Sequence, residues 1–87
     1  MMYPFMTLED NTEIVHSEIL EDGKSVKVYI EKPVIGGFYS AECYLPEYRW
    51  QNIQGFTPEE ISAYENIILS FTDTILYSAS EKDLDNT

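Results

Sequence analysis

Few residues of this chain are of the types that perform nucleophilic catalysis. His16 is the sole histidine and Cys43 the sole cysteine among 87 residues. Ser17 follows His16, but neighbouring residues of a strand point to opposite faces of a sheet, so these two do not form a nucleophile–base pair. Cys43 lies in an alternating apolar segment, where burial raises the pKa of a thiol and makes it unreactive. The sequence therefore predicts a protein that is not an enzyme.

Carboxylates are plentiful, since 16 residues are Asp or Glu, but their spacing matches no metal-binding motif. No loop of the EF-hand type is present, and one cysteine with one histidine is too few for a structural zinc site. Gly36-Gly37 lacks both the lysine and the following helix of a phosphate-binding loop. We therefore expect no metal and no cofactor.

The elements that position these side chains begin with a hairpin signal at Asp22-Gly23. This dipeptide is typical of a two-residue type I′ turn, which needs positive φ at both positions. Such a turn pairs Val15 with Ile30 on an apolar face and His16 with Tyr29 on a polar face. The predicted buried face of the hairpin consists of Val15, Ile19, Val26, Val28 and Ile30.

Two further turns extend this hairpin into a four-stranded antiparallel meander. Asp10-Asn11 closes a first strand, residues 5–8, onto the second. Gly36-Gly37 closes the third strand onto a fourth, which ends before Pro46. Residues 47–56 show neither a strand nor a helix pattern, and whether they cover the polar face of the sheet is left open.

The polar face of this predicted sheet is the strongest candidate for a binding site. A row of aromatic side chains crosses this face, and the row beside it places Glu31 directly opposite Glu42. Like charges in that position destabilise a sheet unless something offsets them. Aromatic side chains beside acids are typical of sites that bind Lys or Arg of a partner. The alternative is that Trp50 covers the aromatic row and Arg49 lies near the acids. The predicted aromatic row consists of Phe5, His16, Tyr29 and Tyr44.

A helix start is recognisable at residues 57–60. Thr57 is the predicted N-cap, Pro58 the first helical residue and Glu60 the capping-box partner of Thr57. Apolar residues at spacings of three and four then predict a helix to about Ala79. Three aliphatic residues fall outside the apolar stripe and are expected to form a weak homodimer or partner surface on the far side of the helix. The stripe is Ile61, Tyr64, Ile68, Phe71 and Ile75, and the surplus residues are Ile67, Leu69 and Leu76.

Charge and composition limit the classes of partner and compartment. A formal charge of −11 repels nucleic acid and anionic membranes and favours a basic protein partner. No apolar run approaches the roughly 20 residues of a membrane span, and the N-terminus has no pattern of a signal peptide. A single thiol fits a reducing cytoplasm. We expect one domain over residues 1–79 and a disordered acidic tail over residues 80–87.

The first part of the chain, Pro4–Ser17 (PFMTLEDNTEIVHS), resembles the start of a family of small bacterial proteins from gut anaerobes, which often begin PFxTLxDGTEIxHS. The resemblance continues at Cys43–Pro46, a Cys-x-Leu-Pro strand end, and at Gly55–Ile61, a helix start of the form GFTxEEI. Asn11 stands where the family usually has glycine. Because no activity is assigned to that family, the resemblance implies a bacterial origin and no mechanism.

Together these patterns predict an α+β fold in which a four-stranded antiparallel β-meander packs against one C-terminal helix. The predicted function is that of a small, acidic, non-catalytic module that binds another protein. The sharper hypothesis is an inhibitor or regulator of a basic nucleic-acid-binding protein. One alternative is a homo-oligomeric assembly component that uses the far side of the helix. The other alternative is an enzyme, which a pocket joining His16 to a carboxylate would favour.

Overall fold

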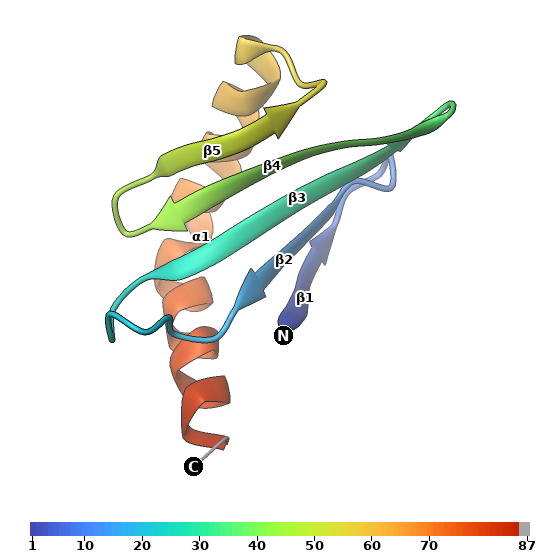
Figure 1. Ribbon diagram of the computed structural model, residues 1–87. Helices are drawn as coiled ribbons and strands as arrows, with labels where there is room; N and C mark the ends of the chain where they lie inside the picture. Colours follow the sequence, from blue (N-terminus) through green and yellow to red (C-terminus); the bar gives the residue numbers. More distant parts are fainter. Residues whose placement is uncertain (86–87) are drawn as a thin grey trace.

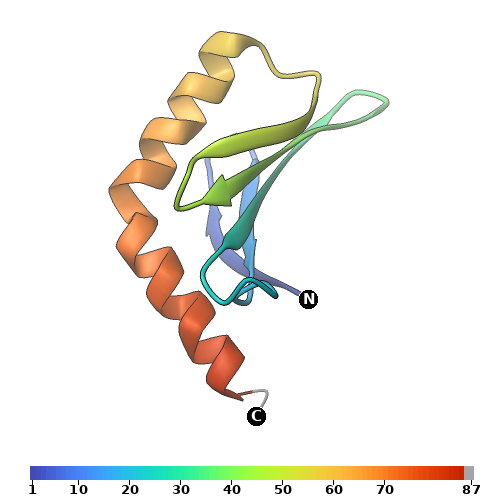
Figure 2. The ribbon, with the colours of Figure 1, turned by 60° about the vertical axis from the view of Figure 1, so that its left-hand side comes forward.

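The computed structural model describes residues 1–85, with side chains for residues 1–82, and consists of one antiparallel sheet with a long helix against one face (Figures 1 and 2). The strands lie side by side in chain order, and each pairs antiparallel with the next. The elements are β1 (Met2–Thr7), β2 (Glu13–Ser17), β3 (Val26–Val34), β4 (Gly37–Leu45), β5 (Arg49–Gln54) and α1 (Pro58–Asp85).

The predicted α+β class is confirmed, but the sheet has five strands rather than four. The fifth strand, β5, comes from the segment for which no element was predicted. Its pairing with β4 is interrupted by a bulge, where Asn52 adopts a φ of 53°. An extra residue in a strand shifts the phase of side-chain alternation, and this hides the strand pattern in the sequence. Because β5 forms the sheet edge, residues 47–56 do not cover the polar face.

The connection between β2 and β3 differs from the predicted two-residue turn. Asp22-Gly23 lies within a loop that spans residues 18–25. The Asp22 carboxylate accepts hydrogen bonds from the backbone N–H groups of Lys24, at 3.0 Å, and Ser25, at 2.8 Å. The Ser25 hydroxyl and these two N–H groups lower the pKa of Asp22 to about 2. These bonds therefore stabilise the loop above about pH 4 and are lost as the pH falls through about 2.

This longer loop shifts the pairing of β2 with β3 by one residue from the predicted register. Ile14 lies opposite Ile30, where the prediction placed Val15. Because side chains alternate along a strand, a shift of one residue moves every side chain of β2 to the other face. Ile14 and His16 are therefore buried beneath α1, and Val15 lies on the uncovered face.

The hydrophobic core lies between α1 and the covered face of the sheet. The predicted helix stripe supplies three of its buried residues, but Phe71 is partly exposed at the sheet edge, where its ring meets Phe5 of β1. The predicted burial of Cys43 is confirmed. The buried core consists of Ile14, Val26, Val28, Ile30, Ala41, Cys43, Leu45, Phe56, Tyr64, Ile68, Ile75 and Ala79.

Helix α1 continues beyond its predicted end. It has 28 residues, which corresponds to about 42 Å of helix. Ala79 is fully buried, and the Lys82 ammonium lies 5.2 Å from the centre of the Tyr3 ring, so the helix makes contacts past its predicted end. The tail predicted to be disordered from Ser80 is thus helical through Asp85. The last two residues of that tail, 86 and 87, lie outside the described part of the chain.

The three surplus aliphatic residues of α1 do not form one exposed patch. Ile67 and Leu76 are half-buried and pack against the core, while Leu69 is 50% exposed. A twisted sheet meets a long helix at different angles along its length, so the contact stripe widens beyond the pattern of a straight helix. The predicted homodimer surface therefore loses two of its three residues to packing within the chain.

The predicted capping box at the start of α1 is confirmed. The Glu60 N–H donates to the Thr57 hydroxyl oxygen at 3.2 Å, and the Thr57 N–H donates to the Glu60 carboxylate at 2.9 Å. Thr57→Ala removes the first bond and is expected to lower the free energy of unfolding by about 1 kcal/mol. Urea unfolding would measure this loss, with Thr74→Ala on the exposed middle of the helix as the control. Equal losses in both variants would contradict the capping role.

Candidate functional site

One face of the sheet is left uncovered by α1, and we call it the open face (Figure 2). Alternation along β3 and β4 leads to this arrangement, because every second residue is buried against α1 over residues 26–30 of β3 and 41–45 of β4. The side chains of the open face include Pro4, Thr7, Glu13, Val15, Lys27, Tyr29, Glu31, Pro33, Phe38, Ser40, Glu42, Tyr44, Arg49, Gln51 and Gln54.

Two residues of the predicted polar-face site, His16 and Phe5, lie on the covered face instead. His16 is only 1% exposed, because the shifted register of β2 turns it towards α1. Its Nδ1–H donates to the Ser17 carbonyl oxygen at 2.8 Å, and its ring centre lies 5.9 Å from that of Tyr3. Phe5 occupies a bulge in β1, which turns its side chain towards α1, where it meets Phe71.

The other four residues of that prediction, Tyr29, Glu31, Glu42 and Tyr44, do lie on the open face. Their cross-strand neighbours differ from those predicted, because β3 and β4 pair two residues away from the predicted register. Tyr29 lies opposite Glu42, and Glu31 lies opposite Ser40. A shift of two residues keeps every side chain on its face, so the prediction identified the face correctly and the neighbours wrongly.

Donors surround Glu42, which lies in the row next to one end of the open face. The Asn52 amide donates to its carboxylate at 2.8 Å, the Tyr44 hydroxyl donates at 3.4 Å, and the Lys27 ammonium lies 3.7 Å away. Beside them the Arg49 guanidinium lies 4.6 Å from the centre of the Tyr44 ring. This end of the face therefore carries two cations and a carboxylate that already has partners.

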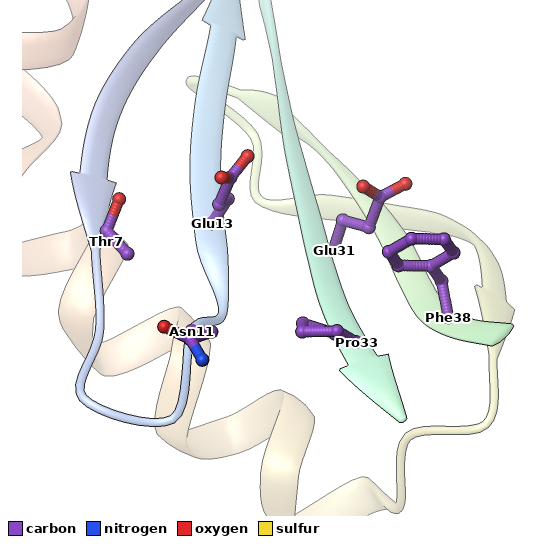
Figure 3. Close-up of a pocket in the computed structure, with 6 residues that line it drawn as sticks. All are labelled: Thr7, Asn11, Glu13, Glu31, Pro33 and Phe38. Atoms are coloured by element: carbon purple, nitrogen blue, oxygen red, sulfur yellow. The ribbon is translucent and has the colours of Figure 1, made fainter. Parts of the chain in front are cut away.

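The glutamates that do face each other are Glu13 of β2 and Glu31 of β3. They line a cavity of about 360 Å³ at the other end of the open face, which we call the acidic hollow (Figure 3). The Tyr29 hydroxyl donates to Glu31 at 3.2 Å, and among the described residues neither glutamate takes part in an ion pair. The lining residues are Thr7, Asn11, Glu13, Glu31, Pro33 and Phe38.

The walls of the acidic hollow combine negative charge with apolar surface. Phe38 is 61% exposed, and it pairs with Pro33 across β3 and β4. No basic side chain is among the described residues that line the cavity. The arrangement suits a ligand group that is cationic at one end and aliphatic along its length.

Sequence reasoning missed Glu13, Pro33 and Phe38 as site residues. One signal in the sequence could have found Glu13. The predicted register places Glu13 on the buried face and Ile14 on the polar face, and this conflict favours the register seen in the structure. No comparable signal marks Pro33 and Phe38, because their position beside Glu31 depends on the pairing of β3 with β4.

The two residue types considered for nucleophilic catalysis, His16 and Cys43, are both buried on the covered face, and neither lines the acidic hollow. In the described part of the chain, no group of three or more His, Cys, Asp or Glu side chains is placed to hold a metal ion. Within the same residues, no helix has the length and apolar character needed to cross a membrane.

Cys43 offers a direct test of core packing. Burial, and to a smaller extent the charge of Glu65, raise the pKa of the Cys43 thiol to about 12. We expect the thiol to resist a thiol-specific reagent at pH 8 in the native protein and to react fully in urea, because reaction needs an accessible thiolate. A Ser62→Cys variant adds an exposed thiol as the control. Equally fast reaction of both thiols in the folded variant would contradict the burial of Cys43.

Comparisons of the chain with protein-family models, with curated proteins and with solved structures find no match. The family resemblance and the bacterial origin therefore stay predictions.

Proposed function

We propose that this protein is a non-catalytic module that binds a basic segment of another protein on its open face. In this proposal the acidic hollow receives a Lys or Arg side chain of the partner. The observation that supports it most directly is the opposed pair Glu13 and Glu31, which has no ion-pair partner among the described residues. A cation between two such carboxylates offsets their repulsion and forms charge-assisted hydrogen bonds.

The walls of the hollow fit the rest of a basic side chain. Lys and Arg place their methylene stems along apolar surface and keep the charged head near polar groups. The Phe38 ring, beside the Glu31 carboxylate, and Pro33 supply that apolar surface (Figure 3). Thr7 and Asn11 also line the hollow and add hydrogen-bonding groups. A cavity of about 360 Å³ is large enough for one such side chain.

The net charge of −11 adds long-range attraction for a basic partner and is expected to speed association at low salt. The carboxylates are spread over the loops, α1 and the open face rather than gathered on one surface. Their arrangement therefore does not favour the sharper hypothesis of an inhibitor or regulator of a basic nucleic-acid-binding protein. Exposed carboxylates away from the open face include Glu9, Glu21, Glu47, Glu59 and Asp73.

The proposal can be tested by NMR titration of the isotope-labelled protein with a peptide, acetyl-TKTVTNT-amide, and with the same peptide carrying glutamine in place of lysine. We expect shifts of amide resonances around Glu13, Glu31 and Phe38 with the lysine peptide only. The double variant Glu13→Gln with Glu31→Gln is expected to weaken binding about tenfold, because it removes charged hydrogen-bond acceptors.

The matched control is the double variant Glu21→Gln with Glu47→Gln, which removes the same charge from exposed loops. This variant is expected to bind almost as the native protein does. Equal weakening in both double variants would show that net charge alone attracts the peptide. Absence of shifts on the open face would overturn the proposal.

A further inference from the structure

The open face carries a second charged feature apart from the acidic hollow. Lys27 lies opposite Tyr44, and Tyr44 lies opposite Arg49, so these residues form one cross-strand row, which we call the basic row. Along β3 the basic row is four residues from Glu31, which is about 13 Å in an extended strand. The open face is therefore acidic at one end and basic at the other.

The two cations of the basic row differ in whether they already have an ion-pair partner. Lys27 lies near Glu42, at 3.7 Å. Arg49 packs its guanidinium over the Tyr44 ring, and in the described residues it takes part in no ion pair. A guanidinium that lies over an aromatic ring still has N–H groups that can donate to a carboxylate. Arg49 is thus the cation of this row that is available to an acidic partner group.

Between the two ends lies a row of different chemistry. Val15 of β2 lies opposite Tyr29 of β3, midway between Glu31 and the basic row. Both side chains are partly exposed, and they offer apolar and aromatic surface. Glu42 lies in the same row, opposite Tyr29, but its carboxylate already has the three partners described above. The open face thus changes from acidic to apolar to basic in steps of two residues along β3. An extended chain has the same step, because its side chains at i, i+2 and i+4 point to one side.

We propose that the partner segment lies extended along β3 and carries a basic, an apolar and an acidic residue at alternate positions. The basic residue enters the acidic hollow, the apolar residue covers Val15 and Tyr29, and the acidic residue binds Arg49. This proposal rests on the proposed function, because it assumes that the open face binds a basic segment. The charges at the two ends would then select partners by the spacing of their own charges.

Three peptides distinguish this proposal from simple attraction to a basic residue. Acetyl-TKTVTDT-amide has the aspartate four residues after the lysine, and acetyl-TKTVDTT-amide has the same composition with the aspartate three residues after it. Acetyl-TKTVTNT-amide has no aspartate. In NMR titrations of the native protein at low salt, we expect the first peptide to bind about twofold to fivefold more tightly than the second, as for a partly exposed ion pair.

The Arg49→Gln variant is expected to bind the first two peptides equally and to retain binding of the third. Lys24→Gln removes the same charge from an exposed loop and is expected to leave the preference unchanged. If the third peptide binds the open face but the first two bind equally to the native protein, the spacing proposal fails and the proposed function stands. The spacing proposal also fails if the preference survives Arg49→Gln. If none of the three peptides shifts the open face, both proposals are overturned.

Discussion

Ile30→Asp is expected to abolish the cooperative unfolding transition of this protein. Ile30 is 0% exposed and lies on the central strand β3, between Ile14 of β2 and Ala41 of β4. A carboxylate at this position has apolar neighbours on both sides and is left without a partner. An uncompensated buried charge costs about 3–5 kcal/mol, which is comparable with the total stability of a small domain.

The matched control is the same substitution at an exposed site, Ile53→Asp. Ile53 lies on the edge strand β5 and is 44% exposed. We expect this variant to unfold cooperatively, with a change of at most about 1 kcal/mol in the free energy of unfolding. Circular dichroism against urea concentration, together with the dispersion of amide resonances, would compare the two variants. A folded Ile30→Asp variant of near-native stability would contradict the core described above.

Ile14→Ala is expected to lower the free energy of unfolding by about 2–5 kcal/mol, and Val15→Ala by about 1 kcal/mol or less. The two residues are neighbours on β2, but Ile14 is buried beneath α1 while Val15 lies on the open face. The difference follows from the lost contacts and the cavity left behind, since a buried site relaxes only partly around a smaller side chain.

This pair of variants also tests the register of β2. The pairing predicted from a two-residue turn at Asp22-Gly23 buries Val15 and exposes Ile14, so it predicts the opposite order of losses. Urea unfolding would measure the loss of free energy in both variants, provided that the free energy of unfolding depends equally on urea concentration in the two variants. Ile14→Val, expected to cost about 0.5–1.5 kcal/mol, adds an intermediate point that separates cavity formation from loss of strand propensity. A larger loss for Val15→Ala than for Ile14→Ala would contradict the observed register.

Local chemistry of the sequence was sufficient to predict the fold class and several element boundaries. The helix start at Thr57 follows from side-chain bonds within one turn, and these bonds are present. The alternation of Val26, Val28 and Ile30 predicted the buried side of β3, which is the side that α1 covers. Alternation along β3 and β4 likewise placed four residues on the open face, because the strand period of two does not depend on pairing. These residues are Tyr29, Glu31, Glu42 and Tyr44.

Only the tertiary structure decided which residues on that face are neighbours. The hydrogen bonds of Asp22 with Lys24 and Ser25 favour a longer loop, and its length sets the register of β2. Bulges at Phe5 and Asn52 change which way side chains point, and a bulge has no fixed signature in a strand pattern. The twist of the sheet lets Ile67 and Leu76 pack against the core, where both are partly buried.

The acidic hollow also depends on the tertiary structure rather than on local sequence patterns. Glu13, Glu31 and Phe38 come from three strands. In the sequence, nothing distinguishes them from the other polar or apolar residues of an alternating strand pattern. Their proximity depends on two registers at once, and a shift of one residue in either would separate them or turn one of them to the opposite face. Local propensity does not choose between neighbouring registers, because each offers nearly the same backbone hydrogen bonds. The length of the connecting loop and the packing of the buried side chains against α1 make that choice together.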